Sequence, residues 1–152
     1  MITFVCGEIC SGKSVVANAY AALTNSPIVE IGSIVRGIKN SEDRDVLQDS
    51  KALTAEIIKV LQQEEEKAMP KTLIAVGPRQ VEIIRKFPHA EFIWIEVPMH
   101  VRKMRFNERR RKGDENIAFE TATVGDLYLG INDVKKYILE TKNQYEILPH
   151  TT

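Results

Sequence analysis

The sequence has no hydrophobic run long enough to cross a membrane, and it contains little cysteine or histidine. A membrane-spanning helix needs about 20 consecutive apolar residues, and no segment of the 152 residues approaches that length. Two cysteines, Cys6 and Cys10, and three scattered histidines are too few for a disulfide framework or a zinc site. Because the chain starts directly with the strand-like run Ile2–Val5, we expect no signal peptide, no membrane contact and a cytoplasmic protein.

The chain also lacks an excess of charge of either sign. Its 21 Lys and Arg residues balance 21 Asp and Glu residues, which gives no overall attraction to nucleic acid or to a membrane surface. Any such role must therefore rest on a local patch. A hydrophobic content of 43% over 152 residues is enough for a substantial core. We expect residues 1–152 to form a single domain.

Short apolar runs alternate with longer stretches that have helical spacing. The expected strands are Ile2–Val5, Ile28–Ile31, Thr72–Val76, Phe92–Glu96 and Tyr145–Leu148. The expected helices include Val15–Leu23, Asp43–Lys67 and Asp133–Lys142. This alternation predicts an α/β fold with a five-stranded parallel sheet flanked by helices. Such sheets bind ligands at the carboxyl ends of their strands.

Residues 7–14 read Gly-Glu-Ile-Cys-Ser-Gly-Lys-Ser, which is the pattern G-x-x-x-x-G-K-[ST] of a phosphate-binding P-loop. Gly7 and Gly12 allow the tight turn that directs backbone N–H groups at phosphates. Lys13 is expected to reach the β- and γ-phosphates of ATP, and the Ser14 hydroxyl to bind Mg²⁺. The residues expected to surround the triphosphate are Gly7, Glu8, Ile9, Cys10, Ser11, Gly12, Lys13, Ser14 and Val15.

Arginines follow three of the expected strands at the same edge of the sheet. Arg36 comes after the second strand, Arg79 after the third, and Arg102, Arg105 and Arg109 after the fourth. Arg102, Arg105 and Arg109 have helical spacing that favours one shared face. A guanidinium binds phosphate oxygens through two parallel N–H groups, so these positions suit phosphate recognition.

The arrangement resembles the nucleoside monophosphate kinases and their dephospho-coenzyme A kinase relatives. Gly32-Ser-Ile-Val-Arg36 is similar to their Gly-Asp-Met-Leu-Arg segment, and Gly77-Pro-Arg79 to their Gly-Phe-Pro-Arg segment. Arg105 and Arg109 match the paired arginines that start the lid of that family, here a short lid around 102–116. The resemblance implies the P-loop NTPase fold of the nucleotide kinase type.

The same resemblance implies roles for individual residues. Arg36 and Arg79 would hold a phosphate of the acceptor, and Arg105 and Arg109 would close over the phosphates of ATP. The purine would lie near the loop that contains Pro149. One departure from the family is the end of the third strand, where Ala75, Val76 and Gly77 stand in place of an acidic residue. Mg²⁺ would then depend on Ser14, the phosphates, water and a carboxylate from elsewhere.

Glu30 ends the second strand, where monophosphate kinases tend to have a small polar residue. A kinase with a hydroxyl acceptor benefits from a carboxylate that takes the proton, and dephospho-coenzyme A kinases place an acid near this position. Glu8 is a second carboxylate in the same region. The alternative is that Glu30 forms a structural ion pair with Arg36 or Arg79. The residues alone leave both interpretations open.

The segment 99–113 contains seven Lys or Arg residues against one acid, Glu108. This charge suits either a lid over ATP or a bound phosphodiester backbone. The chain is similar to small phage-type kinases that phosphorylate 5-hydroxymethyluracil in DNA, which would place it in the host cytoplasm. We expect a phosphotransferase that moves the γ-phosphate of ATP to a nucleotide-type acceptor, first of all that base. A deoxynucleoside monophosphate kinase and a non-catalytic nucleotide-binding switch are the alternatives.

Overall fold

The computed structural model describes residues 1–39, 50–109, 118–141 and 144–147. Its strands form one sheet in the order β2-β3-β1-β4-β5, and every neighbouring pair is parallel. The strands are β1 (Ile2–Gly7), β2 (Ile28–Glu30), β3 (Leu73–Val76), β4 (Glu91–Ile95) and β5 (Gln144–Ile147). The predicted α/β class with a parallel sheet is therefore confirmed.

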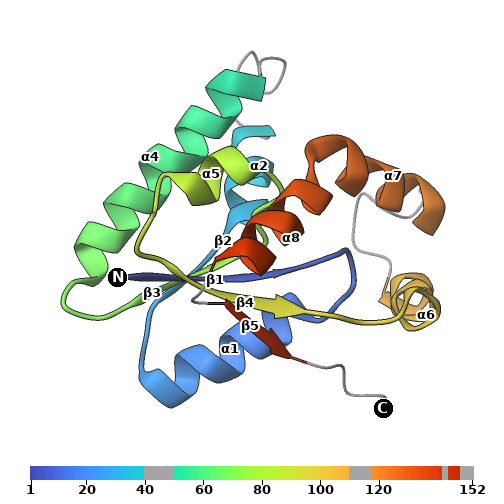
Figure 1. Ribbon diagram of the computed structural model, residues 1–152, viewed down its shortest axis with the longest axis horizontal. Helices are drawn as coiled ribbons and strands as arrows, with labels where there is room; N and C mark the ends of the chain where they lie inside the picture. The colour runs from blue at the N-terminus through green and yellow to red at the C-terminus, as the bar shows by residue number, and fades with distance from the viewer. Residues whose placement is uncertain (40–49, 110–117, 142–143, 148–152) are drawn as a thin grey trace.

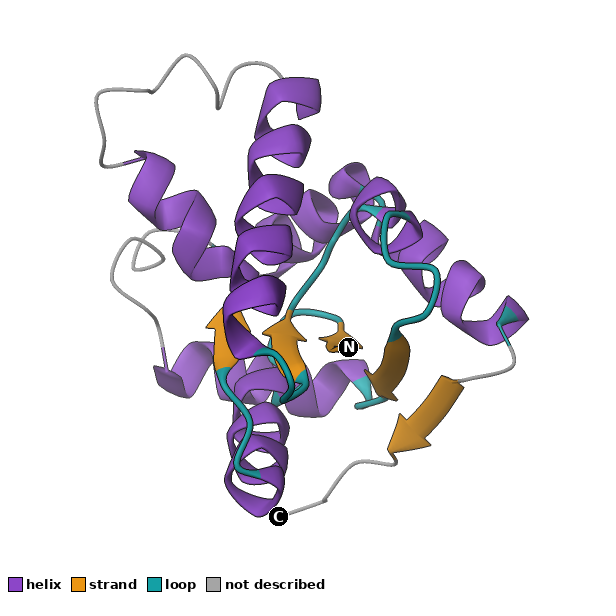
Figure 2. Ribbon diagram, turned by 90° about the vertical axis from the view of Figure 1, so that its left-hand side faces the viewer, coloured by secondary structure: helices purple, strands orange, loops and turns teal. Residues whose placement is uncertain are grey.

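Helices cover both faces of this sheet (Figures 1 and 2). The helices are α1 (Lys13–Thr24), α2 (Ile31–Lys39), α4 (Ser50–Ala68), α5 (Val81–Arg85), α6 (Met99–Arg109), α7 (Phe119–Leu129) and α8 (Ile131–Glu140). Helix α1 packs on one face, while α4, α5 and α8 pack on the other. In Figure 1, α6 and α7 lie at the end of the sheet where the strands finish.

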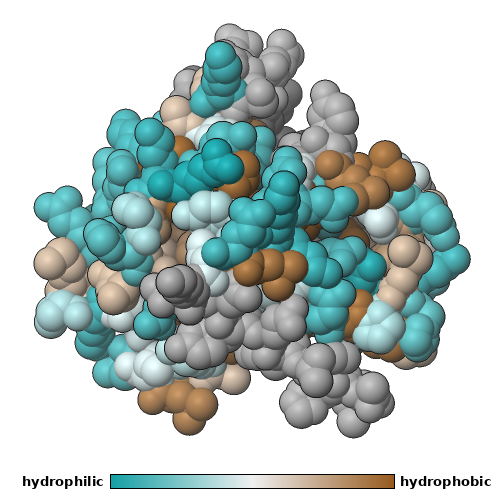
Figure 3. Space-filling view, in the orientation of Figure 1, coloured by the Kyte–Doolittle hydropathy of each residue, from teal (hydrophilic) through white to brown (hydrophobic). Residues whose placement is uncertain are grey.

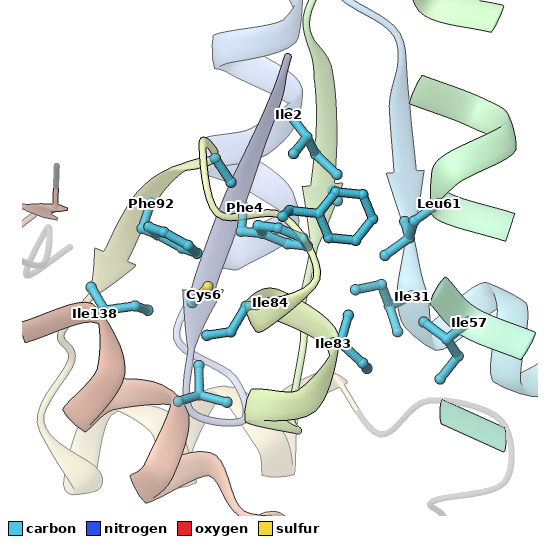
Figure 4. Packing of buried hydrophobic residues seen from close by; sticks show 14 of the residues in the cluster. Ile2, Phe4, Cys6, Ile31, Ile57, Leu61, Ile83, Ile84, Phe92 and Ile138 are labelled. Carbon is cyan, nitrogen blue, oxygen red and sulfur yellow. The ribbon is translucent and has the colours of Figure 1, made fainter. Parts of the chain in front are cut away.

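The two faces follow from the alternation of side chains along each strand. On β1, Phe4 and Cys6 point into the larger cluster with α4, α5 and α8 (Figure 4), and Val5 points into the smaller cluster with α1. The ring of Phe4 stacks on that of Phe92 with centroids 5.7 Å apart. Both cysteines are free thiols, and burial raises the pKa of Cys6 far above its usual range. Cys6 is therefore an apolar core residue.

The structure shifts several predicted boundaries. Strand β2 ends at Glu30, and α2 begins at the next residue, so Ile31 is the first residue of a helix and not the last of a strand. The predicted helix Asp43–Lys67 corresponds to α4 from Ser50 onward, and its first part lies outside the described residues. The described helices α2, α5 and α7 had no counterpart among the sequence predictions because they are short or follow a strand or loop directly.

The surface in the orientation of Figure 1 is mostly hydrophilic, and a group of hydrophobic side chains lies over α7 (Figure 3). Val124 and Leu127 are the large exposed apolar residues of that helix. Across the described part of the chain, no helix combines the length and the apolar character that a membrane span requires.

Candidate active site

The phosphate loop leaves β1 at Gly7 and enters α1 at Lys13. Its turn needs two left-handed residues, Cys10 with φ 60° and Gly12 with φ 89°. A Cβ on Gly7 would collide with the Ser11 side chain and would lie 3.0 Å from the carbonyl oxygen of Ile95. No side chain caps the first turn of α1, so its amide N–H groups remain open to an anion. The predicted P-loop is therefore a tight turn that leads into an uncapped helix start, an arrangement that suits an anion.

Lys13 lies folded over this loop. Its Nζ donates hydrogen bonds to the carbonyl oxygens of Gly7 and Glu8, each at 3.0 Å. The aliphatic side chain of Lys13 passes beside Gly77: a Cβ on this glycine would lie 3.6 Å from Cε of Lys13. Burial lowers the pKa of Lys13 to about 8; the nearby charge of Asp126 opposes this shift, and that of Arg79 adds to it. The ammonium group is thus a poorly hydrated cation that an incoming phosphate can bind.

Asp126 of α7 is a buried carboxylate that the sequence analysis missed. Its Oδ2 accepts a hydrogen bond from the backbone N–H of Ile9 at 2.9 Å, across 117 residues of sequence. Its Oδ1 forms an ion pair with Nε of Arg79 at 3.1 Å. Arg79 is therefore at the site, as predicted, but it is paired with Asp126 and not with Glu30.

Arg102 is the buried member of the predicted arginine face of α6. Its side chain is only 4% exposed and forms an ion pair with Glu8 at 3.0 Å. Its Nε donates to the carbonyl oxygen of Val97, and its guanidinium lies over the ring of Phe119. Arg102, Arg105 and Arg109 all contact the phosphate loop, so these three arginines share one face of α6 as the spacing indicated, and Arg102 is the one that fastens the helix to the loop. Glu8 is correspondingly engaged by Arg102 and does not face the acceptor as a free carboxylate.

Arg105 and Arg109 reach the phosphate loop from the same helix. Nη1 of Arg105 lies 3.4 Å from the carbonyl oxygen of Cys10 and 3.6 Å from the position of a Cβ on Gly12. Nη2 of Arg109 lies 3.2 Å from Sγ of Cys10. Beneath them, Cys10 packs in a small apolar cluster with Phe106 and Phe119. Two arginines that the sequence assigned to ATP thus lie against the loop that would hold its phosphates.

Residues 110–116 of the predicted lid and Pro149 of the predicted purine site lie outside the described residues. The described part of the predicted lid, from Arg102 to Arg109, is the C-terminal two-thirds of α6. It is a helix packed on the phosphate loop through the contacts of Arg102 and Phe106.

Glu30 ends β2 and Arg36 lies in α2, and β3 separates β2 from β1, the strand that leads into the phosphate loop. Ile28 packs in the cluster with α1 and Val29 in the opposite cluster, so strand alternation places Glu30 on the α1 face. Within residues 1–39, 50–109, 118–141 and 144–147, Glu30 forms no hydrogen bond or ion pair, and the exposed Arg36 donates to Oγ of Ser33 at 3.0 Å. The expected alternative, an ion pair of Glu30 with Arg36 or Arg79, is therefore absent.

The end of β3 contains no acid, as the sequence indicated, because Val76 leads directly into Gly77. In the described parts of the chain, no group of three His, Cys, Asp or Glu residues is arranged to hold a metal. Ser14 at the start of α1 fits a metal that is held mainly by nucleotide phosphates, and Glu30 is the uncommitted carboxylate on the same face of the sheet.

Neither the models of known protein families nor the curated protein sequences give a match to this chain. Solved structures, in contrast, give matches over nearly the whole chain. TT1252 from Thermus thermophilus superposes with a TM-score of 0.66 at 16% identity, covering 100% of this chain and 90% of that one. Shikimate kinase from Acinetobacter baumannii, in complex with shikimate, gives 0.65 at 12% identity, covering 99% and 84%. A gluconokinase from Sinorhizobium meliloti 1021 gives 0.63 at 13% identity, covering 99% and 83%. At these identities the likeness establishes the fold alone, which this chain shares with TT1252, the shikimate kinase and the gluconokinase.

Proposed function

We propose that this protein is a kinase that transfers the γ-phosphoryl group of ATP to a hydroxyl acceptor. The observation that carries the proposal is the convergence of Lys13, Arg105 and Arg109 on one P-loop. A nucleotide-binding switch needs the loop and its lysine, but phosphoryl transfer also needs cations that stabilise the charge of the transferred group. The fold shared with shikimate kinase and gluconokinase supports the same reaction class.

The residues have separate tasks in this reaction. The open amides at the start of α1 bind the phosphates of the substrate ATP, and Lys13 exchanges its two carbonyl partners for phosphate oxygens. Arg105 and Arg109 lie beside the same loop and stabilise charge on the phosphoryl group as it leaves ADP. A magnesium ion held by Ser14 and the phosphates would neutralise part of that charge.

The acceptor side of the proposal rests on Glu30. Glu30, at the carboxyl end of β2, has no ion-pair partner among the described residues, and such a carboxylate is able to accept the proton of a hydroxyl group. An acceptor that is already a phosphate needs no such base, and an unpaired carboxylate would repel it. Arg36 and Arg79 supply cations for an anionic group elsewhere on the acceptor.

For the particular acceptor, we propose 5-hydroxymethyluracil in DNA, on the basis of the basic segment 99–113. Two cations of that segment already have partners inside the protein: Arg102 binds Glu8, and Lys103 binds Glu120 at 2.7 Å. The charge left for a DNA backbone is therefore smaller than the sequence total. A base in a duplex would also have to leave the stack to reach the site.

The test offers labelled ATP and Mg²⁺ with four kinds of acceptor in parallel: DNA containing 5-hydroxymethyluracil, ordinary DNA, deoxynucleoside monophosphates, and small hydroxy acids or sugars. Transfer to a hydroxyl acceptor is expected, and Lys13→Ala should abolish it. Label in monophosphates alone would contradict the hydroxyl acceptor. Bound ATP without transfer to any acceptor would contradict the kinase and favour a switch.

A further inference from the structure

The Asp126 carboxylate joins three segments that are distant in sequence. It belongs to α7, its Oδ2 accepts a hydrogen bond from the N–H of Ile9 in the phosphate loop, and its Oδ1 forms an ion pair with Nε of Arg79 in the loop after β3, without hydrogen-bond geometry. Asp126 is only 3% exposed, whereas the Arg79 side chain is 47% exposed. The pair therefore has a buried end at Asp126 and a half-exposed end at Arg79.

The ion pair between Arg79 and Asp126 leaves the two Nη groups of the guanidinium available to bind a ligand. The ion pair uses Nε, the nitrogen closest to the backbone, so the two Nη groups are not part of that contact. Within the described residues, the guanidinium has no other hydrogen bond or ion pair. Two Nη groups that share one plane form the fork that binds carboxylate or phosphate oxygens in pairs.

We infer that Asp126 is a positioning residue, which orients Arg79 as a ready-made receptor for an anionic group of the acceptor. The inference rests on the proposed function and deepens it. A free arginine loses side-chain entropy when it binds a ligand, and an arginine already fixed at Nε loses less. Asp126 and Arg79 also act on the charge of Lys13 with opposite sign, because the carboxylate attracts the ammonium group and the guanidinium repels it. The negative charge of Asp126 thereby offsets the repulsion between Arg79, which is proposed to bind the acceptor, and Lys13, which is proposed to bind ATP.

The test measures binding of inorganic phosphate by calorimetry, with the phosphate loop saturated by a non-hydrolysable ATP analogue and Mg²⁺. Asp126→Asn keeps the shape of the side chain and removes its charge, and it should weaken phosphate binding about tenfold. Arg79→Ala should weaken it by a similar or larger factor. Adding Asp126→Asn to Arg79→Ala should then cause little further loss, because both changes remove the same receptor.

Two further variants keep the inference open to contradiction. Asp133→Asn removes the same charge from an exposed site in the first turn of α8 and should leave phosphate binding unchanged. Arg79→Lys retains the charge but has no Nε donor and no fork, and it serves if Asp126→Asn does not fold. Wild-type affinity in Arg79→Lys, or losses that add in the double variant, would overturn the inference.

A second readout does not depend on binding. The Nε–H of Arg79, which lies beside the Asp126 carboxylate, should give a proton–nitrogen NMR signal in the wild type, identified by its loss in Arg79→Lys. That signal should broaden or vanish in Asp126→Asn. A signal unchanged in that variant would show that Asp126 does not orient Arg79.

The two proposals can fail separately. If no acceptor is phosphorylated, the kinase is contradicted, while the NMR signal and the phosphate titration still decide the role of Asp126. If the enzyme is active, Asp126→Asn should raise KM for the acceptor about tenfold with a smaller change in kcat. An equal loss in KM for ATP and for the acceptor would instead indicate a general structural role and overturn the inference.

Discussion

Arg102 of α6 and Glu8 of the phosphate loop form an ion pair of 3.0 Å, in which the arginine side chain is 4% exposed. The pair connects the first helix after β4 to the loop after β1. Arg102 also donates a hydrogen bond to the carbonyl oxygen of Val97, so its side chain links the segment after β4 to the phosphate loop. Helix α6 is therefore fastened to the loop at its start, while Arg105 and Arg109 extend over the loop from the following turns.

Loss of this arginine should destabilise the whole protein. Arg102→Ala would leave the carboxylate of Glu8 and the carbonyl oxygen of Val97 without their donor in a largely buried place. We expect the free energy of unfolding to fall by about 3 kcal/mol. Urea denaturation followed by circular dichroism would measure it.

The matched control is Lys103→Ala on the next residue of the same helix. Lys103 forms an ion pair with Glu120, but both side chains are more than half exposed. An exposed pair contributes little to stability, so the denaturation midpoint should stay at the wild-type value. Equal shifts in the two variants would mean that Arg102 has no special role.

ATP binding should depend on pH through Lys13. Its pKa of about 8 lies below the ordinary lysine value of 10.5, so the ammonium form is lost as the pH rises through 8. Since the charged form binds phosphate, the affinity for ATP should be highest near pH 7 and fall progressively towards pH 10. Titration with a fluorescent ATP analogue at several pH values would measure this decline, which Lys13→Met should remove.

Two variants should move the midpoint of that decline in opposite directions. Arg79 lowers the pKa of Lys13 by repulsion, so Arg79→Ala should shift the decline to higher pH. Asp126 raises the pKa of Lys13 by attraction, so Asp126→Asn should shift it to lower pH. A shift of the same sign in both variants would contradict this account of the charges around Lys13.

Glu30→Gln should separate catalysis from binding. The change removes the proposed proton acceptor without changing the size of the side chain, and kcat for a hydroxyl acceptor should fall by about 10²–10⁴-fold. Affinity for the ATP analogue without Mg²⁺ should remain near the wild-type value, because Glu30 forms no hydrogen bond or ion pair with the phosphate loop among the described residues. If raised Mg²⁺ concentration restores the rate, Glu30 serves the metal and not the proton.

Much of the fold could be predicted because the relevant signals are local. The alternation along β1 is visible in Phe4, Val5 and Cys6, and the loop sequence from Gly7 to Ser14 specifies a turn that only a few residue types permit. Helix α2 was hidden because it follows Glu30 without a turn residue or a cap.

The site was less predictable because its contacts join residues that are distant in sequence. Spacing places Arg102 on the same side of a helix as Arg105, and only the docking of α6 decides which of the two is buried. Asp126 carries no motif, and its partner Ile9 is 117 residues away. The one available signal was an acidic residue inside an otherwise apolar stretch, Val124 to Leu129, which sequence alone does not connect to Arg79.

Gly77 offers a test of how closely Lys13 depends on the loop after β3. Its φ of +82° is unfavourable for any residue with a Cβ, and that atom would lie 3.6 Å from Cε of Lys13. Gly77→Ala should therefore cost about 1–2 kcal/mol of stability through backbone strain. It should also weaken ATP binding, because a shift of the strained loop would displace the lysine that lies against it. Denaturation and nucleotide titration measure the two effects independently.

Gly125→Ala supplies the contrast. Gly125 lies inside α7, and a Cβ there would meet nothing within 4 Å. Alanine favours a helix interior over glycine, so this variant should gain about 0.5–1 kcal/mol of stability and bind ATP as the wild type does. The same substitution would then have opposite effects at these two glycines, because Gly77 combines a left-handed backbone with Lys13 as a neighbour and Gly125 has neither. A stable Gly77→Ala with unchanged ATP affinity would show that the loop after β3 does not constrain Lys13.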